Sequence, residues 1–226
     1  REVLRQATGL LAQSGVPDAA HDAQVLLAET LGIGRLEMLA GIGALTLDGE
    51  TLGLFQSLTG RRASREPLQY ILGRADFMGH SFQVRPGVLI PRQDSETLCQ
   101  LAIGKLTKPG QTALDLCCGS GCLGISLKLA RAKANVWASD LSPLATGLTR
   151  ENAALLGADL QVLEGDLFDP VRGRRFDLVV CNPPYIPRGE LTGLQAEVQR
   201  EPMLALDGGP DGLDLYRRVL EEAPRH

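Results

Sequence analysis

The chain has 226 residues, of which 44% are hydrophobic, and a formal net charge of −4. This length and composition predict a packed globular protein with one large domain, or with one large and one small domain. No stretch approaches the ~18 apolar residues of a membrane span, and the N-terminus lacks the pattern of a secretion signal. The acidic balance argues against a broad surface for nucleic acid. We expect a cytoplasmic protein without a membrane partner.

The cysteines also favour a reducing compartment. Their number is odd, and four of the five fall around one region instead of forming a spaced framework. The adjacent pair Cys117-Cys118 matches none of the common metal-ligand spacings, and no histidine lies near it in the sequence. We therefore expect small residues in a tight turn and no metal.

The N-terminal region, residues 1–65, shows helical periodicity. Apolar residues recur three and four apart, as in Leu4, Ala7 and Leu11. Asp18 and Asp48 are candidate N-caps of two of the helices. The pattern predicts a small helical bundle, which serves either as a structural cap or as a docking site for a macromolecular partner.

Residues 66–91 change to an extended pattern. The short runs 82–84 and 88–90 flank the turn signal Arg85-Pro86-Gly87, so we expect a β-hairpin linker here. After the linker, Asp94 or Ser95 is expected to cap a helix.

From Thr112 onward, strand and helix patterns alternate. This alternation predicts an α/β fold with a doubly wound parallel sheet, in a domain that spans residues 92–226. The expected strands are 112–116, 135–139, 160–163 and 176–181, with a helix over 142–156.

The first of these strands leads into a glycine-rich turn. Gly119 and Gly121 would let a ligand approach the backbone. Asp140, at the end of the next strand, can accept hydrogen bonds from both hydroxyls of a ribose. These features predict a nucleotide-cofactor site. The spacing also fits the dinucleotide fingerprint, with an acidic residue about 20 positions further on, so this motif alone leaves NAD as an alternative.

The tetrapeptide Asn182-Pro183-Pro184-Tyr185 follows the apolar run that ends at Cys181. Two prolines cannot continue a sheet ladder and restrict the residue before them, so the loop should be stiff. Ligands bind at the carboxyl ends of strands in open α/β sheets, where Asn182 and the Pro183 carbonyl could accept both hydrogens of a planar NH2 group. Alkylation of an amino group needs such a pair of acceptors, and hydride transfer does not. The two motifs together therefore favour S-adenosylmethionine over NAD.

A further acidic residue, Asp166, follows the third expected strand. From its place in the β-α-β order, we predict that Asp166 receives the adenine amino group and that Leu167 or Phe168 packs against the ring.

Several segments resemble the HemK/PrmC family, the glutamine N5-methyltransferases that modify peptide-chain release factors. The resemblance covers almost the whole chain and is more specific than Asn-Pro-Pro-Tyr alone. The segments are Glu66–Gly73, Ile90–Glu96, Asn182–Tyr185 and parts of Glu201–Leu213. They imply a Rossmann-like class I methyltransferase domain, joined by a hairpin to a helical N-terminal domain.

The resemblance implies transfer of a methyl group from S-adenosylmethionine to the side-chain amide of the glutamine in a Gly-Gly-Gln motif, with S-adenosylhomocysteine as the second product. Release factors are the expected partners, and no direct nucleic-acid substrate is expected. The expected cofactor residues are Asp115, Cys117, Cys118, Gly119, Ser120, Gly121, Asp140, Asp166, Leu167 and Asn182. The expected substrate clamp is Asn182, Pro183, Pro184 and Tyr185, of which Asn182, Pro183 and Tyr185 are assigned to catalysis.

Three features depart from the family pattern. Cys117 stands where the family's cofactor loop usually opens with glycine, and Gln93 replaces the second proline of the Ile90–Glu96 run. The strands that normally complete a seven-stranded sheet are expected to be absent before His226, which would leave an unfinished sheet edge.

Two other functions stay open at this stage. A nucleic-acid adenine-N6 methyltransferase would use the same clamp but should bind with steep salt dependence, and the acidic charge balance disfavours it. A non-catalytic module could hold the cofactor while the sheet edge serves as an interaction surface.

Overall fold

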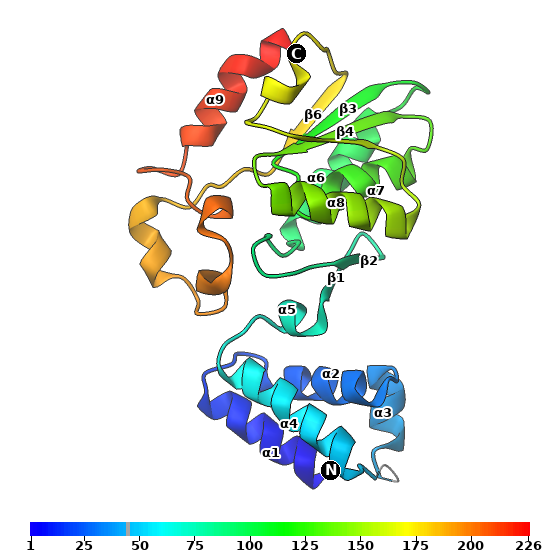
Figure 1. Ribbon diagram of the computed structural model, residues 1–226, viewed down its shortest axis with the longest axis vertical. Helices are drawn as coiled ribbons and strands as arrows, with labels where there is room; N and C mark the ends of the chain where they lie inside the picture. The colour runs from blue at the N-terminus through cyan, green and yellow to red at the C-terminus, as the bar shows by residue number, and fades with distance from the viewer. Residues whose placement is uncertain (44–45) are drawn as a thin grey trace. The chain divides into compact units, whose positions relative to one another are not determined.

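The computed structural model describes residues 1–43 and 46–226 and divides into two compact units, Arg1–Gly73 and Arg74–His226 (Figure 1). None of the helices formed by the described residues is long and apolar enough to cross a membrane.

The first unit is a bundle of helices around one apolar core. Its helices are α1 (Glu2–Gln13), α2 (Ala19–Leu31), α3 (Arg35–Gly41), α4 (Gly49–Ala63) and α5 (Leu68–Leu72). Leu11, Leu26, Met38 and Phe55 are at most 1% exposed and fill the centre. Because each comes from a different helix, burying them together holds the bundle closed.

One predicted N-cap of this unit is confirmed, and two details differ from the sequence prediction. Asp48 caps α4, since its carboxylate accepts the Thr51 N–H at 2.8 Å. Asp18 stands at the N-cap of α2 but makes no capping hydrogen bond with the residues that the structure describes. Residues 68–72, expected to be extended, form the short helix α5, which starts after Pro67 and ends at Gly73 in the left-handed conformation.

The second unit contains the predicted doubly wound parallel sheet. Its strands are β3 (Thr112–Leu116), β4 (Asn135–Asp140), β5 (Gln161–Glu164) and β6 (Leu178–Cys181), in the order β5-β4-β3-β6. Every pairing is parallel. The chain winds outward from β3 to β5 and then returns to place β6 on the other side of β3. The point where the winding reverses therefore lies between β3 and β6.

Helices cover both faces of this sheet (Figure 1). The helices are α6 (Asp94–Lys105), α7 (Cys122–Ala130), α8 (Pro143–Leu156) and α9 (Asp214–Glu222). Ala113 of β3 packs with residues of α6 and α7, whereas Leu114 and Leu116 pack with residues of α9. This division follows from the two-residue period of a strand, which turns alternate side chains to opposite faces.

The hairpin lies earlier in the chain than predicted. It consists of β1 (Arg74–Phe77) and β2 (His80–Gln83), paired antiparallel. Residues 88–90, predicted as its second strand, are not a strand. The true turn, Met78-Gly79, has φ angles of 50° and 76°, and methionine gives no sequence signal for such a turn. The Glu96 carboxylate accepts the Met78 N–H at 2.7 Å and supports this unusual conformation.

The buried side chain of Asn152, on α8, joins three parts of the second unit. Its Nδ2 group donates to the carbonyls of Gln83 at 3.0 Å and of Ser120 at 2.9 Å. Its Oδ1 accepts the Gln83 N–H at 2.8 Å. One fully buried amide thus ties β2 and the loop after β3 to the same helix.

We predict that Asn152→Asp lowers the free energy of unfolding of this unit by roughly 2–5 kcal/mol, because two buried carbonyls would lose their donors and face a carboxylate. Urea denaturation followed by fluorescence of Trp137, the single tryptophan, reports on this unit. Leu155→Ala, on the exposed side of α8, is the control and should change stability by no more than about 0.5 kcal/mol. An Asn152→Asp variant as stable as the control would contradict the assignment.

Candidate cofactor and substrate site

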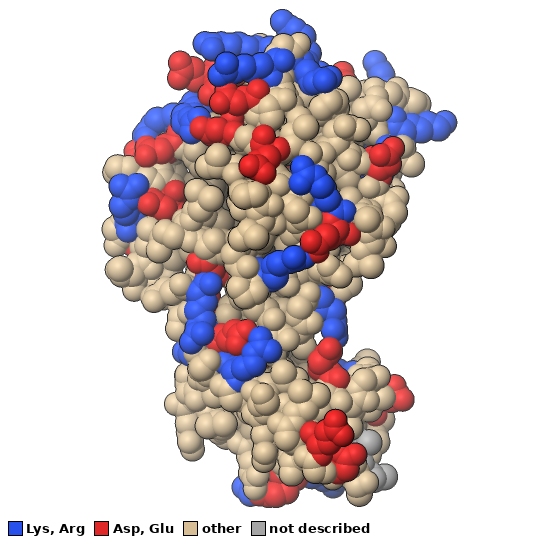
Figure 2. All heavy atoms as spheres, viewed as in Figure 1, with Lys and Arg blue, Asp and Glu red and all other residues tan. Residues whose placement is uncertain are grey.

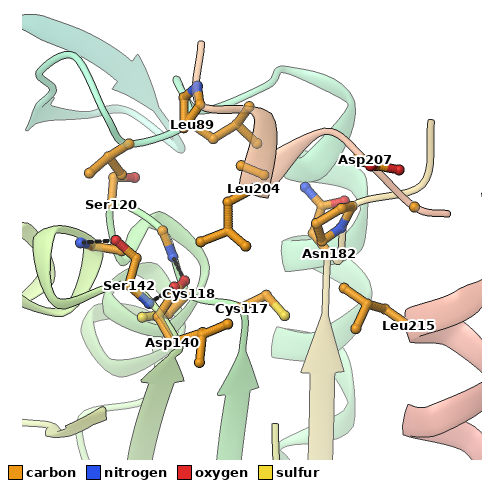
Figure 3. A pocket seen from close by; sticks show the side chains of 18 of the residues that line it. Leu89, Cys117, Cys118, Ser120, Asp140, Ser142, Asn182, Leu204, Asp207 and Leu215 are labelled. Atoms are coloured by element: carbon orange, nitrogen blue, oxygen red, sulfur yellow. Dashed lines mark hydrogen bonds between the residues drawn. The ribbon is translucent and has the colours of Figure 1, made fainter. Parts of the chain in front are cut away.

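A cavity of about 350 Å³ opens at the carboxyl ends of β3, β4 and β6 (Figure 3). Its lining residues include Cys117, Cys118, Gly119 and Ser120 of the loop after β3, Asp140 at the end of β4, Gly165, Asp166 and Leu167 after β5, and Asn182 and Pro184 of the Asn-Pro-Pro-Tyr motif. Residues of the segments 87–92 and 202–209 also contribute to its walls. The cofactor loop and the Asn-Pro-Pro-Tyr motif, more than sixty positions apart in the sequence, therefore face one space.

The loop after β3 is shaped by left-handed backbone. Cys117, Gly119 and Gly121 have φ angles of 57°, 57° and 81°. At Gly121 a Cβ atom would lie 2.7 Å from the Thr149 Cγ2 atom, so only glycine fits there, whereas a Cβ on Gly119 would meet nothing within 4 Å. A non-glycine residue in this conformation costs about 1–2 kcal/mol. Cys117 carries that cost as a residue other than glycine in the left-handed conformation.

Asp140 links the end of β4 to this loop. Its Oδ2 atom accepts the Gly119 N–H, and its Oδ1 atom accepts the Ser142 N–H, both at 2.9 Å. Burial raises the pKa of the Asp140 carboxyl, and these backbone hydrogen bonds oppose the shift. Each oxygen keeps a second lone pair, so the side chain can hold the loop and still accept from a ligand in the cavity.

Asn182 comes directly after β6 and faces the cavity (Figure 3). Its Nδ2 group donates to the Ser95 hydroxyl at 3.3 Å. Pro184 is buried and lines the cavity, whereas Pro183 and Tyr185 do not line it, and the Tyr185 side chain is 55% exposed. Asn182 is thus the polar side chain that the motif offers to a ligand.

The backbone after this motif is held by a neighbouring segment. The Ile186 N–H donates to the Leu206 carbonyl at 3.0 Å, and the Gly208 N–H donates to the Ile186 carbonyl at 2.9 Å. A Cβ atom on Gly208 would lie 2.7 Å from the Tyr185 Cα atom. The glycine therefore permits the close contact that fixes the loop.

Comparison with known proteins identifies the family. The PrmC N-terminal domain matches residues 2–73, and the methyltransferase small domain matches residues 86–198. The release factor glutamine methyltransferase of Geobacter sulfurreducens is 42% identical over 227 residues, covering 100% of this chain and 79% of that protein. The chain belongs to the release factor glutamine methyltransferase family.

A second relative agrees with this assignment. The release factor glutamine methyltransferase of Moorella thermoacetica is 42% identical over 226 residues, which cover 99% of this chain and 80% of that protein. A solved methyltransferase from Pyrococcus furiosus is similar in structure over 65% of this chain and 64% of that chain, with 17% identity and a TM-score of 0.46. Family membership, with the sheet order, confirms the class I methyltransferase fold that the sequence predicted.

Two of the predicted cofactor residues, Asp115 and Asp166, make hydrogen bonds to other parts of the protein. Asp115 is fully buried beneath the loop and does not line the cavity. Its Oδ2 atom accepts the Gly124 N–H at 2.8 Å, and its Oδ1 atom has no hydrogen-bond partner among the residues that the structure describes. Asp166 lines the cavity, and its carboxylate also accepts from the Arg218 guanidinium at 2.8 Å.

The contact between the Ile90–Glu96 run and Glu201 was not predicted from the sequence. Glu201 is 5% exposed. Its carboxylate accepts the Ile90 N–H at 3.0 Å and an N–H of Arg92 at 2.5 Å. It therefore holds one wall of the cavity against another. Both segments were recognised by their resemblance to the family, but a pairing across more than a hundred positions gives no local signal.

The unpartnered oxygen of Asp115 leads to a prediction about pH. Burial raises the pKa of this carboxyl from 3.8 to about 7. The folded protein therefore binds this proton more tightly than the unfolded chain does. The resulting contribution to the free energy of unfolding is fully present below the unfolded pKa of 3.8 and is lost as pH rises through about 7.

Asp115→Asn cannot ionise, and its Oδ1 atom can still accept the Gly124 N–H. We therefore expect the wild type to lose up to a few kcal/mol more stability than this variant between about pH 5 and about pH 8. Urea denaturation at the two pH values measures the difference. Parallel pH profiles for the two proteins would show that Asp115 does not titrate in this range.

Proposed function

We propose that this chain transfers the methyl group of S-adenosylmethionine to the side-chain amide nitrogen, N5, of the glutamine in the Gly-Gly-Gln motif of peptide-chain release factors. One observation carries the proposal: Asn182 and the glycine-rich loop open into the same cavity, in a chain 42% identical over its whole length to a release factor glutamine methyltransferase. A role on release factors would place the protein in the cytoplasm.

The residues around the cavity fit S-adenosylmethionine. The space beside Gly119 is open where a side chain would otherwise project, and Asp140 offers acceptor lone pairs suited to ribose hydroxyls. Asp166 and Leu167 line the cavity beyond β5 and would serve the adenine end. The cofactor supplies a methyl group on a positively charged sulfonium.

The clamp would act by position. An amide nitrogen is a poor nucleophile because its lone pair is delocalised into the carbonyl. We assign Asn182 Oδ1 and the Pro183 carbonyl to accept the two N–H hydrogens, which directs the nitrogen lone pair at the methyl group, while Tyr185 packs on the amide. As the N–C bond forms, the C–S bond breaks, its electron pair stays on sulfur, and one N–H proton leaves to solvent. Correct positioning can remove up to ~7–11 kcal/mol of a barrier.

The charge distribution supports a protein substrate over a nucleic acid. On the face shown in Figure 2, acidic and basic side chains of the second unit are interspersed. Several arginines of the second unit are paired with carboxylates: Arg172 with Asp169, Arg217 with Asp211, and Arg218 with Asp166. Such pairing leaves less free positive charge for phosphates.

Asn182→Ala should lower turnover by at least about 100-fold, by analogy with removal of one aligned group that stabilises a transition state, and cofactor binding should survive. Mass spectrometry of a purified release factor, incubated with enzyme and S-adenosylmethionine, would detect the methyl group. A release factor with Gln→Asn in the motif and unmethylated DNA are the substrate controls. Asn135→Ala, at the opposite end of the sheet, should behave as wild type. Transfer to DNA adenine, or near-normal turnover by Asn182→Ala, would overturn the proposal.

Asp140→Ala should weaken S-adenosylmethionine binding by at least about tenfold, because hydrogen bonds to a charged acceptor contribute about 1.5–3 kcal/mol each. Calorimetric titration with S-adenosylhomocysteine measures the affinity without turnover. Asp159→Ala, an exposed carboxylate in the loop before β5, is the matched control. Equal affinities for the two variants would remove Asp140 from the ribose role.

A further inference from the structure

The Ile90–Glu96 run makes three side-chain contacts with three different parts of the second unit. Arg92 pairs with the buried Glu201, and Glu96 accepts the Met78 N–H in the hairpin turn. Between them, the Ser95 hydroxyl accepts a hydrogen bond from Asn182 Nδ2 at 3.3 Å. Ser95 is half-buried and lines the same cavity as Asn182. Asp94 or Ser95 was expected to cap α6, but that helix begins at Asp94 with Gln93 at its N-cap, so both residues lie within its first turn.

The contact with Ser95 has a chemical consequence because an asparagine amide has two unlike ends. The NH2 end only donates and the oxygen end only accepts. With Nδ2 engaged by Ser95, the Oδ1 atom is the end left for a ligand. A glutamine amide presents N–H donors at its nitrogen, so the clamp works only with this orientation of the Asn182 side chain. In the reversed orientation two NH2 groups would meet.

The two prolines keep the Asn182 Oδ1 atom available. An asparagine oxygen often accepts the N–H of the residue two positions ahead and forms an Asx-turn. Here that residue is Pro184, which has no N–H, and Pro183 has none either. Neither of the next two residues can therefore compete with a substrate for the oxygen.

The segment that carries Ser95 is itself held by hydrogen bonds on both sides of this residue. On one side of it, Ile90 and Arg92 are held by the buried carboxylate of Glu201. On the other side, Glu96 is held by the backbone of Met78 at 2.7 Å. A short side chain on a segment fixed at both ends has little freedom to move its oxygen.

We propose that Ser95 is a positioning residue: it fixes the orientation of the Asn182 amide so that the clamp accepts the N–H groups of its substrate. This inference rests on the proposed function and assigns Ser95 no contact with the reacting atoms. The two prolines offer no N–H to the Oδ1 atom of Asn182, and Ser95 orients this atom toward the substrate.

The test compares three variants in the release factor methylation assay. Ser95→Ala removes the acceptor for Asn182 Nδ2 and should lower kcat by roughly 10- to 100-fold, since a small misplacement of a catalytic group can cost about 100-fold. The affinity for S-adenosylhomocysteine, the KM for the release factor and the thermal midpoint should stay those of the wild type. Ser95→Thr keeps the hydroxyl and should recover most of kcat. Thr97→Ala removes an exposed hydroxyl from the same helix and should match the wild type.

Each result has one reading. A selective fall in kcat that threonine restores supports the positioning role. An unchanged kcat in Ser95→Ala overturns it, as does a fall that is accompanied by equal losses of cofactor affinity or stability, because Ser95 would then be a structural residue. A wild type that does not methylate the glutamine refutes the proposed function itself, and that outcome is seen before any variant is made.

Discussion

The site depends on the parallel pairing of β3 with a strand on each side. Leu116, the last residue of β3, is in register with Ser139 of β4 and with Cys181 of β6. The next residues along the three strands are Cys117, Asp140 and Asn182, so the cofactor loop, the acidic residue and the clamp leave the sheet at one level. Since a slip of one residue would turn each strand's side chains to the opposite face, the buried faces of β3 fix this alignment.

Beyond the sheet, a small number of buried polar groups hold the walls of the cavity. Asn152 ties the loop after β3 to the hairpin, and Asp140 ties that loop to the start of α8. Glu201 lies just before the short helix η4 (Met203–Ala205) and ties this segment to the segment before α6. Each group bonds to backbone, and so each constrains the path of the chain as well as a side chain. Buried groups of this kind are costly unless satisfied, so they favour one arrangement of the loops over others.

Much of this could be predicted from the sequence because the signals are local. The strand Thr112–Leu116 was placed correctly from its apolar run, and the loop after it was recognised from Gly119 and Gly121, which both have positive φ angles in the structure. The strand ending at Cys181 was predicted to begin at residue 176, two residues before the observed start. The hairpin was misplaced because Arg85-Pro86-Gly87 carries a stronger turn signal than Met78-Gly79, whose conformation is supported by Glu96, eighteen positions away. Local propensity cannot report a partner of that kind.

The same limit applies to the site. Asn182 was predicted as an acceptor, but the sequence could not show that its Nδ2 group donates to Ser95, because Ser95 lies 87 positions before it. Nor could it show that Asp115 lies beneath the loop, bonded to the Gly124 N–H, instead of lining the cavity. Both facts depend on contacts between elements. The candidate residues of this site could therefore be predicted from motifs, whereas the contacts of their side chains could be seen only in the structure.

The orientation matters because of the chemistry proposed here. Methylation of an amide needs no strong base, since the N–H becomes acidic once the nitrogen starts to bond to the methyl group. It does need two acceptors that stay in place as positive charge develops on nitrogen, because acceptors that must reorient during the reaction stabilise that charge less. A backbone carbonyl between two prolines cannot rotate freely. The side chain of Asn182 has no such constraint of its own, and so a site of this design requires a neighbour that holds it, which is the role we propose for Ser95.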